Sequence, residues 1–309
     1  MIYCQAKMSP HGLGNKLFPW ARCRIFSHVH GIPMLAPEWF QIPKGLFVPG
    51  FKKKYYFKTF FHNLFKQDGR NGDVKGLNKL WLNCTAEEKE EPEKLFAFVR
   101  ENSKRDQIVT FRREPQIWPQ NRFLPLNGWD EFLHQELRMI TQDRWLRIVD
   151  SFEEVPIGIP VRFELQIGGS LDWFIESLKT IRAILGFPAQ AIVTTDGNEK
   201  DVKDLLVLEN VQFLHASAIA ELLVLSKAKI LLASGHSSFS TWASFLGQMP
   251  TICNPTTTYR GLYFHEGFGL KNRNGQYLGP FDPASPQPVF VEQLKELFNL
   301  SEESTPIHN

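Results

Sequence analysis

The amino-acid sequence predicts an α/β protein with two domains, on three observations. Its 309 residues are about the length of two ordinary domains. The second half alternates short β-branched runs with amphipathic helical stretches, which is typical of a parallel sheet covered by helices. Proline and glycine punctuate residues 152–160, where the composition also changes. We therefore expect an N-terminal domain over residues 1–153 and a C-terminal domain over residues 154–309.

The hydrophobic pattern predicts the elements of each domain. In the C-terminal domain the expected strands are 159–164, 191–195, 211–214, 229–233 and 251–253, and the expected helices are 171–185, 199–206, 218–227, 238–247 and 289–300. The N-terminal domain is less regular, with an expected strand at 2–6, turn at 11–14, helix at 15–30, strand at 32–35 and helical stretch at 129–149.

Composition excludes several classes of protein. Hydrophobic residues make up 43% and charged residues 22% of the chain, so a disordered or collagen-like chain is excluded. No apolar run approaches the ~20 residues that cross a bilayer. The first residues lack the pattern of a signal peptide, so we expect a cytoplasmic protein. The four cysteines form no Cys-x-x-Cys pair, so we expect neither a disulfide framework nor a zinc site.

Basic residues are concentrated near the start of the chain. Residues 1–75 contain twelve Lys and Arg against three acidic residues, whereas the whole chain has a net charge of +2. This distribution favours an anionic partner for the N-terminal half. Lys52, Lys53 and Lys54 precede aromatic residues that suit a lipid headgroup layer or a sugar ring, and an ordinary solvated surface is the alternative. No nucleic-acid-binding motif occurs, so we expect no nucleic acid partner.

Three turns combine a strand end, small residues and a helix start, which together offer backbone N–H groups to an anion. The first is Gly12-Leu13-Gly14-Asn15, where the glycines allow close backbone approach and Asn15 can cap the helix or bind a ligand. A simple tight turn is the alternative. The pattern is not the dinucleotide-binding fingerprint, because Leu17 stands where the third glycine would be.

The other two turns belong to the C-terminal domain. Arg162 lies within an apolar run, where it either pairs with a carboxylate or offers its planar fork to a phosphate. Residues 234–243 contain four serines and follow a predicted strand, at the end of an open parallel sheet where ligands bind. Helix capping is the alternative, but a cap needs only one hydroxyl.

In this order, the three turns resemble motifs of the fucosyltransferase superfamily, which includes the α-1,2-, α-1,6- and protein O-fucosyltransferases. Residues 12–18 are similar to Gly-Leu-Gly-Asn-Gln-Met/Leu-Phe, and residues 237–243 are similar to the Ser-Ser-Phe-Ser stretch of that superfamily. Pro160-Val161-Arg162 stands where the superfamily has His-x-Arg-Arg-Gly-Asp, with Phe163 in place of the second arginine. The resemblance covers about residues 1–35 and 157–254.

The resemblance implies a GT-B type glycosyltransferase, with two Rossmann-like domains facing across a cleft and the nucleotide-sugar held mainly by the C-terminal domain. It implies GDP-fucose as donor, inversion at the sugar, and no obligatory metal or other cofactor. Arg162 would be the catalytic contact to the β-phosphate. The implied substrate-binding residues are Gly14, Asn15, Asp196, His236, Ser237, Ser238 and Phe239. Capping of an exposed turn is the alternative for Asp196, and lining the strand end is the alternative for His236.

The acceptor and the general base are less well defined. We expect a glycan or a lipid-linked oligosaccharide as acceptor, with peripheral membrane contact through the lysine cluster. His11 and Glu38 are candidate bases, and a structural role is the alternative for each. The chain contains no Asp-x-Asp, so protein groups must meet the charge of the leaving diphosphate. A catalytically eroded nucleotide- or glycan-binding protein, or a transferase for another nucleotide-sugar, remains the competing interpretation.

Overall fold

The protein was analysed as a computed structural model, which describes residues 2–8, 12–39, 65–66, 78–82, 97, 101, 107–112, 123, 126–163, 171–234, 237–253 and 281–300. The chain forms two compact units. The first comprises Met1–Arg147 with Ser217–Ile219, and the second Ile148–Ala216 with Ala220–Asn309. The main division therefore follows residue 147, whereas the sequence placed it after residue 153.

The first unit contains a parallel sheet of three strands in the order β1-β3-β2. The strands are β1 (Ile2–Lys7), β2 (Asn78–Leu82) and β3 (Gln107–Arg112). The strand expected at 32–35 is reduced to a bridge between Met34 and Cys4. Pro33 lacks an N–H, so the segment bonds to β1 through the carbonyl of Pro33 and the N–H of Leu35, at 3.0 and 2.8 Å.

The first unit also contains the helices α1 (Leu13–His30), α4 (Asp130–Ile140) and most of α5 (Asp143–Asp150). Helix α1 begins two residues before the expected start and ends at Gly31, whose φ of 62° is the left-handed cap that glycine favours. Side chains on all sides of α1 are buried, including those of Leu17, Trp20 and Phe26. Helix α1 is therefore a core element of the first unit.

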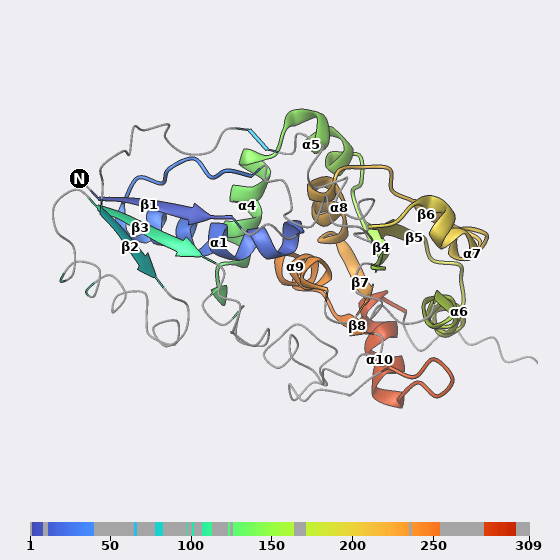
Figure 1. Cartoon of the computed structure of the whole chain (residues 1–309). Coiled ribbons are helices and arrows are strands. Elements are labelled where there is room, and N and C mark those ends of the chain that lie inside the picture. Colours follow the sequence, from blue (N-terminus) through green and yellow to red (C-terminus); the bar gives the residue numbers. More distant parts are fainter. Residues whose placement is uncertain are drawn as a thin grey trace, which may run out of the picture. The chain divides into compact units, whose positions relative to one another are not determined.

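Five parallel strands form the sheet of the second unit, in the order β6-β5-β4-β7-β8 (Figure 1). They are β4 (Val155–Val161), β5 (Ala191–Thr195), β6 (Val211–Phe213), β7 (Ala228–Ala233) and β8 (Thr251–Cys253). The chain starts at the centre, proceeds to β6 on one side, and returns to β7 on the other. This is the strand order of a Rossmann-like unit, with its topological switch point between β4 and β7. The predicted α/β class is confirmed.

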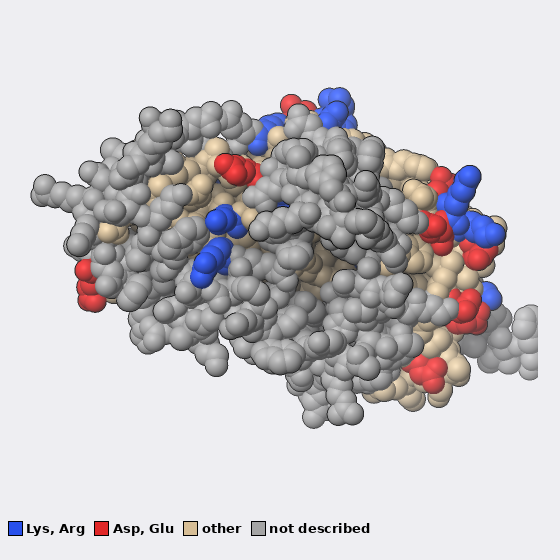
Figure 2. Space-filling view, in the orientation of Figure 1, with Lys and Arg blue, Asp and Glu red and all other residues tan. Residues whose placement is uncertain are grey.

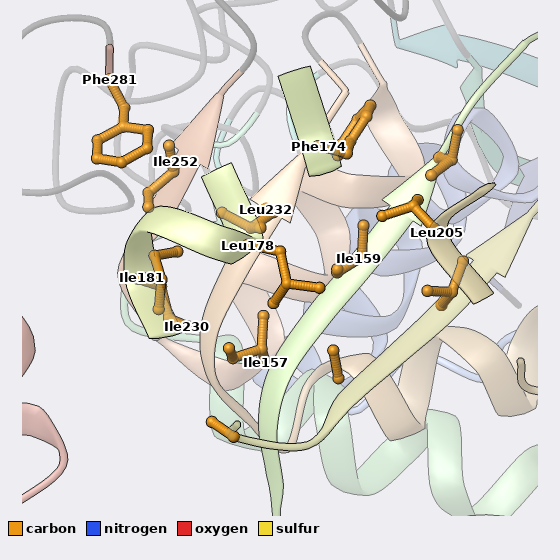
Figure 3. Packing of buried hydrophobic residues seen from close by; sticks show 14 of the residues in the cluster. Ile157, Ile159, Phe174, Leu178, Ile181, Leu205, Ile230, Leu232, Ile252 and Phe281 are labelled. Atoms are coloured by element: carbon orange, nitrogen blue, oxygen red, sulfur yellow. The ribbon is translucent and has the colours of Figure 1, made fainter. Parts of the chain in front are cut away.

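Helices cover both faces of this sheet. On one face, α6 (Leu171–Leu185), α7 (Lys203–Leu206) and α10 (Pro288–Leu297) pack against the strands in a buried apolar cluster (Figure 3). Its central side chains are those of Ile157, Ile159, Leu178, Ile230 and Leu232, all 0% exposed. On the other face lie α8 (Ala218–Leu225) and α9 (Ser238–Gly247). A Cβ added to Gly158 would lie 2.9 Å from Leu225 Cδ2, so α8 packs closely over this part of β4 and its leucine side chain would have to shift.

Most of the proline- and glycine-rich stretch 152–160 lies within the central strand β4, which begins at Val155 instead of at the expected residue 159. Prolines are tolerated there because the two sides of β4 differ. Pairing with β5 continues to Val161 opposite Thr195, whereas pairing with β7 ends at Gly158 opposite Leu231. The same register would place Pro160 opposite Ala233, but proline has no N–H for the ladder.

Strands β2 and β3 of the first unit were not predicted, whereas the other differences from the expected elements are small. Strands β5 and β8 and helices α6 and α9 have the predicted bounds. The helix expected over 199–206 divides into a 3-10 turn, η6 (Glu199–Val202), and the short α7. None of the helices within the described residues is long and apolar enough to cross a membrane.

One buried charge in α1 has a measurable consequence. The side chain of Lys16 is 1% exposed, and its Nζ donates a hydrogen bond to the carbonyl of Trp39 at 2.6 Å. Loss of solvation lowers the pKa of Lys16 from 10.5 to about 8. Below this range, Lys16 is protonated in both the folded and the unfolded protein. Between the two pKa values the unfolded chain binds the extra proton, so stability rises with pH.

We therefore expect the free energy of unfolding of the wild type, relative to Lys16→Met, to rise between about pH 8 and pH 10.5. At 1.36 kcal/mol per pKa unit, the rise is about 3 kcal/mol at most. Urea unfolding of both proteins over this pH range measures the difference. A difference that stays constant with pH would show that the pKa of Lys16 is not lowered by folding.

Candidate functional site

The candidate site lies at the switch point of the second unit. Arg162 directly follows β4, and Ser234 directly follows β7. Because both strands run in the same direction, these residues meet at the carboxyl edge of the sheet, where open α/β sheets bind ligands. Helix α9 begins at the same edge (Figure 1). The structure therefore brings together two of the three turns that the sequence singled out.

The guanidinium group of Arg162 has no ionic partner among the described residues. Its Cζ lies 3.7 Å from the centre of the Phe239 ring in the first turn of α9, so the cation stacks on an aromatic face. Its Nε and Nη2 atoms are buried and make no hydrogen bond within the described part of the chain. Buried N–H groups without acceptors are costly. Within the described residues, these two atoms are therefore free to donate to an anionic acceptor.

The start of α9 adds a second electropositive feature. The side chain of Ser237 caps the helix by accepting a hydrogen bond from the N–H of Ser240 at 3.2 Å. The first turn of α9 contains no acidic residue, so the positive end of the helix dipole is not neutralised locally. Ser238 is partly exposed at this end. One serine acts as a cap, as the alternative interpretation predicted, and Ser238 is accessible to a ligand.

Asp196 organises the backbone next to Arg162. Its side chain is 8% exposed, and Oδ1 accepts a hydrogen bond from the N–H of Phe163 at 2.9 Å. The turn after Asp196 is tightly packed, because a Cβ on Gly197 would lie 2.6 Å from Asp201 Oδ2 and 3.1 Å from Phe163 Cδ2. Asp196 is itself buried, and residues 198–200 that follow in the turn are exposed. A contact between Asp196 and a ligand's base or ribose stays a prediction.

The remaining predicted site residues belong to the first unit or lie outside the described residues. Gly14 is buried and Asn15 is partly buried in the first turn of α1, in the first unit, and their contact with a ligand stays a prediction. Glu38 is exposed in the same unit. His11, His236 and the lysine cluster at 52–54 lie outside the described residues. On the described surface in Figure 2, Lys and Arg are interspersed with Asp and Glu.

Sequence reasoning included Ser234 in the serine-rich turn but assigned it no role. The hydroxyl of Ser234 accepts a hydrogen bond from the N–H of Arg162 at 3.0 Å and donates one to the carbonyl of Pro160 at 3.3 Å. The available signal was a hydroxyl directly after an apolar strand, but its partner depends on strand order. Among the described residues, no group of three or more His, Cys, Asp and Glu side chains is placed to hold a metal ion.

Comparison with known proteins finds no matching family model and no matching curated protein. The chain is similar to the solved structure of fucosyltransferase NodZ from Bradyrhizobium, with 16% identity and a TM-score of 0.48, over 82% of this chain and 96% of that chain. It is also similar to a mutant of Arabidopsis thaliana FUT1 in complex with GDP, with 15% identity and a TM-score of 0.46, over 93% and 81% of the chains.

A third similar structure is POFUT1 in complex with GDP-fucose, with 9% identity and a TM-score of 0.42, over 82% of this chain and 97% of that chain. At these identities and scores the likeness assigns no activity to this chain. The case for an activity rests on the residues at the switch point.

The Ser237 cap can be tested by stability alone. We expect Ser237→Ala to lower the free energy of unfolding by ~1 kcal/mol, because the N–H of Ser240 loses its acceptor. Ser237→Asp restores an acceptor and should recover the wild-type value in denaturant unfolding. If Ser237→Ala were as stable as the wild type, the hydroxyl would contribute nothing as a cap.

Proposed function

We propose that this chain is an inverting, metal-independent glycosyltransferase that transfers fucose from GDP-fucose to a glycan or a lipid-linked oligosaccharide. The observation that carries the proposal is Arg162 at the switch point, which stacks on Phe239 and whose buried Nε and Nη2 atoms make no hydrogen bond within the described residues. The identity of the donor rests on the resemblance of the three turns to fucosyltransferase motifs. The acceptor is proposed from the basic, aromatic stretch near residue 52.

A diphosphate suits the chemistry of this site. The guanidinium fork matches two phosphate oxygens, and such charge-assisted pairs are stronger than neutral hydrogen bonds. Helix α9 directs its first N–H groups toward the same edge of the sheet, which favours a phosphate there. Stacking on Phe239 fixes the plane of the fork before the ligand arrives. Arg162 and the start of α9 therefore supply two contacts to one anion.

The same groups would promote transfer. The acceptor hydroxyl forms a bond to the anomeric carbon as the bond from that carbon to the phosphate oxygen breaks, and the electron pair passes to the β-phosphate. Negative charge grows on this phosphate in the transition state, so the hydrogen bonds from Arg162 strengthen as the reaction proceeds. Asn15 would contact the diphosphate or the sugar. The acceptor proton passes to a base that the described residues do not identify.

A nucleotide-binding protein without turnover is the second candidate. It is favoured by Phe163, which stands where the related motif has a second arginine. The Phe163 ring packs against the apolar cluster of the second unit, so it supplies no charge to a phosphate. Binding of GDP without consumption of GDP-fucose would support this candidate over a transferase.

We expect Arg162→Lys to reduce turnover of GDP-fucose by ~10²-fold or more, because lysine keeps the charge but loses the two-pronged contact. The variant should unfold at the wild-type temperature and show a smaller thermal shift with GDP. In the wild type, GDP at a hundred times its dissociation constant stabilises the fold by ~2.7 kcal/mol. Turnover assays and thermal unfolding with GDP and other nucleoside diphosphates provide the measurement.

Arg182→Lys is the matched control, since Arg182 donates two hydrogen bonds to the carbonyl of Ala189 and serves the fold alone. If Arg162→Lys melted the protein while its folded fraction kept full activity, Arg162 would be a structural residue. If no nucleoside diphosphate shifted the wild-type melting temperature, both nucleotide-binding candidates would be wrong.

Chelation should leave the reaction nearly unchanged. The sequence has no Asp-x-Asp to hold a metal-bound diphosphate, and the proposal assigns the leaving charge to Arg162 and α9. Turnover measured with EDTA, and again with added magnesium or manganese, tests this assignment. Loss of turnover in EDTA that manganese or magnesium restores would contradict the metal-free mechanism.

A further inference from the structure

The feature that carries a further inference is the break between β4 and β7. Strand β7 continues to Ala233 and remains paired with β8 up to Cys253. Its pairing with β4 has already ended at Gly158 opposite Leu231. The two central strands are therefore no longer bonded directly over the last residues before the site. Arg162 is carried on this partly unpaired end of β4.

Ser234 bridges the break with one hydroxyl group. It accepts from the N–H of Arg162 at 3.0 Å and donates to the carbonyl of Pro160 at 3.3 Å. The N–H of Arg162 and the carbonyl of Pro160 are thus both bonded to the side chain of Ser234. On the other parts of this edge, the backbone of β7 would make such bonds. A serine hydroxyl provides both functions, since it has one hydrogen and two lone pairs.

The opposite side of β4 is held separately. The next N–H, that of Phe163, donates to Asp196 Oδ1 at 2.9 Å, from the segment after β5. Successive amides beyond the end of β4 are therefore fixed from the two neighbouring strands. Ser234 provides the bond from the β7 segment, because the backbone ladder on that side has stopped.

We infer that Ser234 is a positioning residue for Arg162, an inference that rests on the proposed function of the site. Ser234 is 2% exposed, so it acts through the backbone of Arg162 and not by touching the ligand. Its hydrogen bonds fix the backbone position from which the Arg162 side chain extends, and Phe239 fixes the plane of the guanidinium group. A bidentate contact depends on both, because the fork has a fixed geometry.

The test is a double-mutant cycle of Ser234→Ala and Arg162→Lys, read by titration calorimetry with GDP. In the wild-type background we expect Ser234→Ala to weaken GDP binding about tenfold, the size of one net hydrogen bond. In the Arg162→Lys background, Ser234→Ala should weaken GDP binding by less than about twofold. The flexible lysine side chain acts as a point charge, so its contact does not depend on a fixed backbone position. Ser234→Thr keeps the hydroxyl and should recover most of the affinity.

Ser226→Ala is the matched control, since Ser226 is a buried serine of the same unit whose hydroxyl donates to the Leu223 carbonyl at 2.8 Å. It should change the melting temperature without changing GDP affinity. An equal loss from Ser234→Ala in both arginine backgrounds, or wild-type affinity in Ser234→Ala, would overturn the inference. Failure of the wild type itself to bind GDP would instead reject the proposed function, and the inference with it.

Discussion

The missing N–H of Pro160 is the constraint on which the candidate site depends. It coincides with the early end of the β4 ladder with β7, while the ladder with β5 runs on to Val161. Direct pairing of the two central strands of this Rossmann-like sheet thus ends at the switch point, the position where open α/β sheets bind ligands. Arg162 lies at the end of β4, beside this break in the pairing, and Ser234 bridges it.

Two polar atoms of the site, Nε and Nη2 of Arg162, are buried without acceptors among the described residues. A buried donor without an acceptor costs about 1–3 kcal/mol. The apolar cluster between the sheet and helices α6, α7 and α10 supports the sheet whether or not an anion is bound. Functional residues are often energetically unfavourable where they lie, and the packing of the surrounding core offsets the free energy that they cost. An anion that pairs with Arg162 recovers this free energy, so ligand binding and local stability are coupled.

The sequence predicts some parts of this structure well and others poorly, for physical reasons. Strand β5 and helix α9 have the predicted bounds because an apolar run and a serine cap mark their ends locally. The start of β4 was missed because proline and glycine are typical of a linker. They fit a strand here only because of how each edge of β4 pairs with its neighbouring strand, which the sequence does not show. The choice between an ion pair and a ligand at Arg162, and the role of Ser234, both depend on which strands become neighbours. Strand order is a tertiary property that local patterns do not encode.

Side chains alternate between the two faces of β4, and this alternation determines where a second arginine would lie. Ile157, Ile159 and Val161 face the apolar cluster, and Phe163 continues this row by packing against the same cluster. Gly158 and Arg162 belong to the other row, whose contacts are Leu225 of α8 and Phe239 of α9. A second arginine at position 163 would therefore start on the core side of β4, with its N–H already bound to Asp196. If a diphosphate binds here, Arg162 and the start of α9 must meet its charge, which makes the positioning of this single guanidinium decisive.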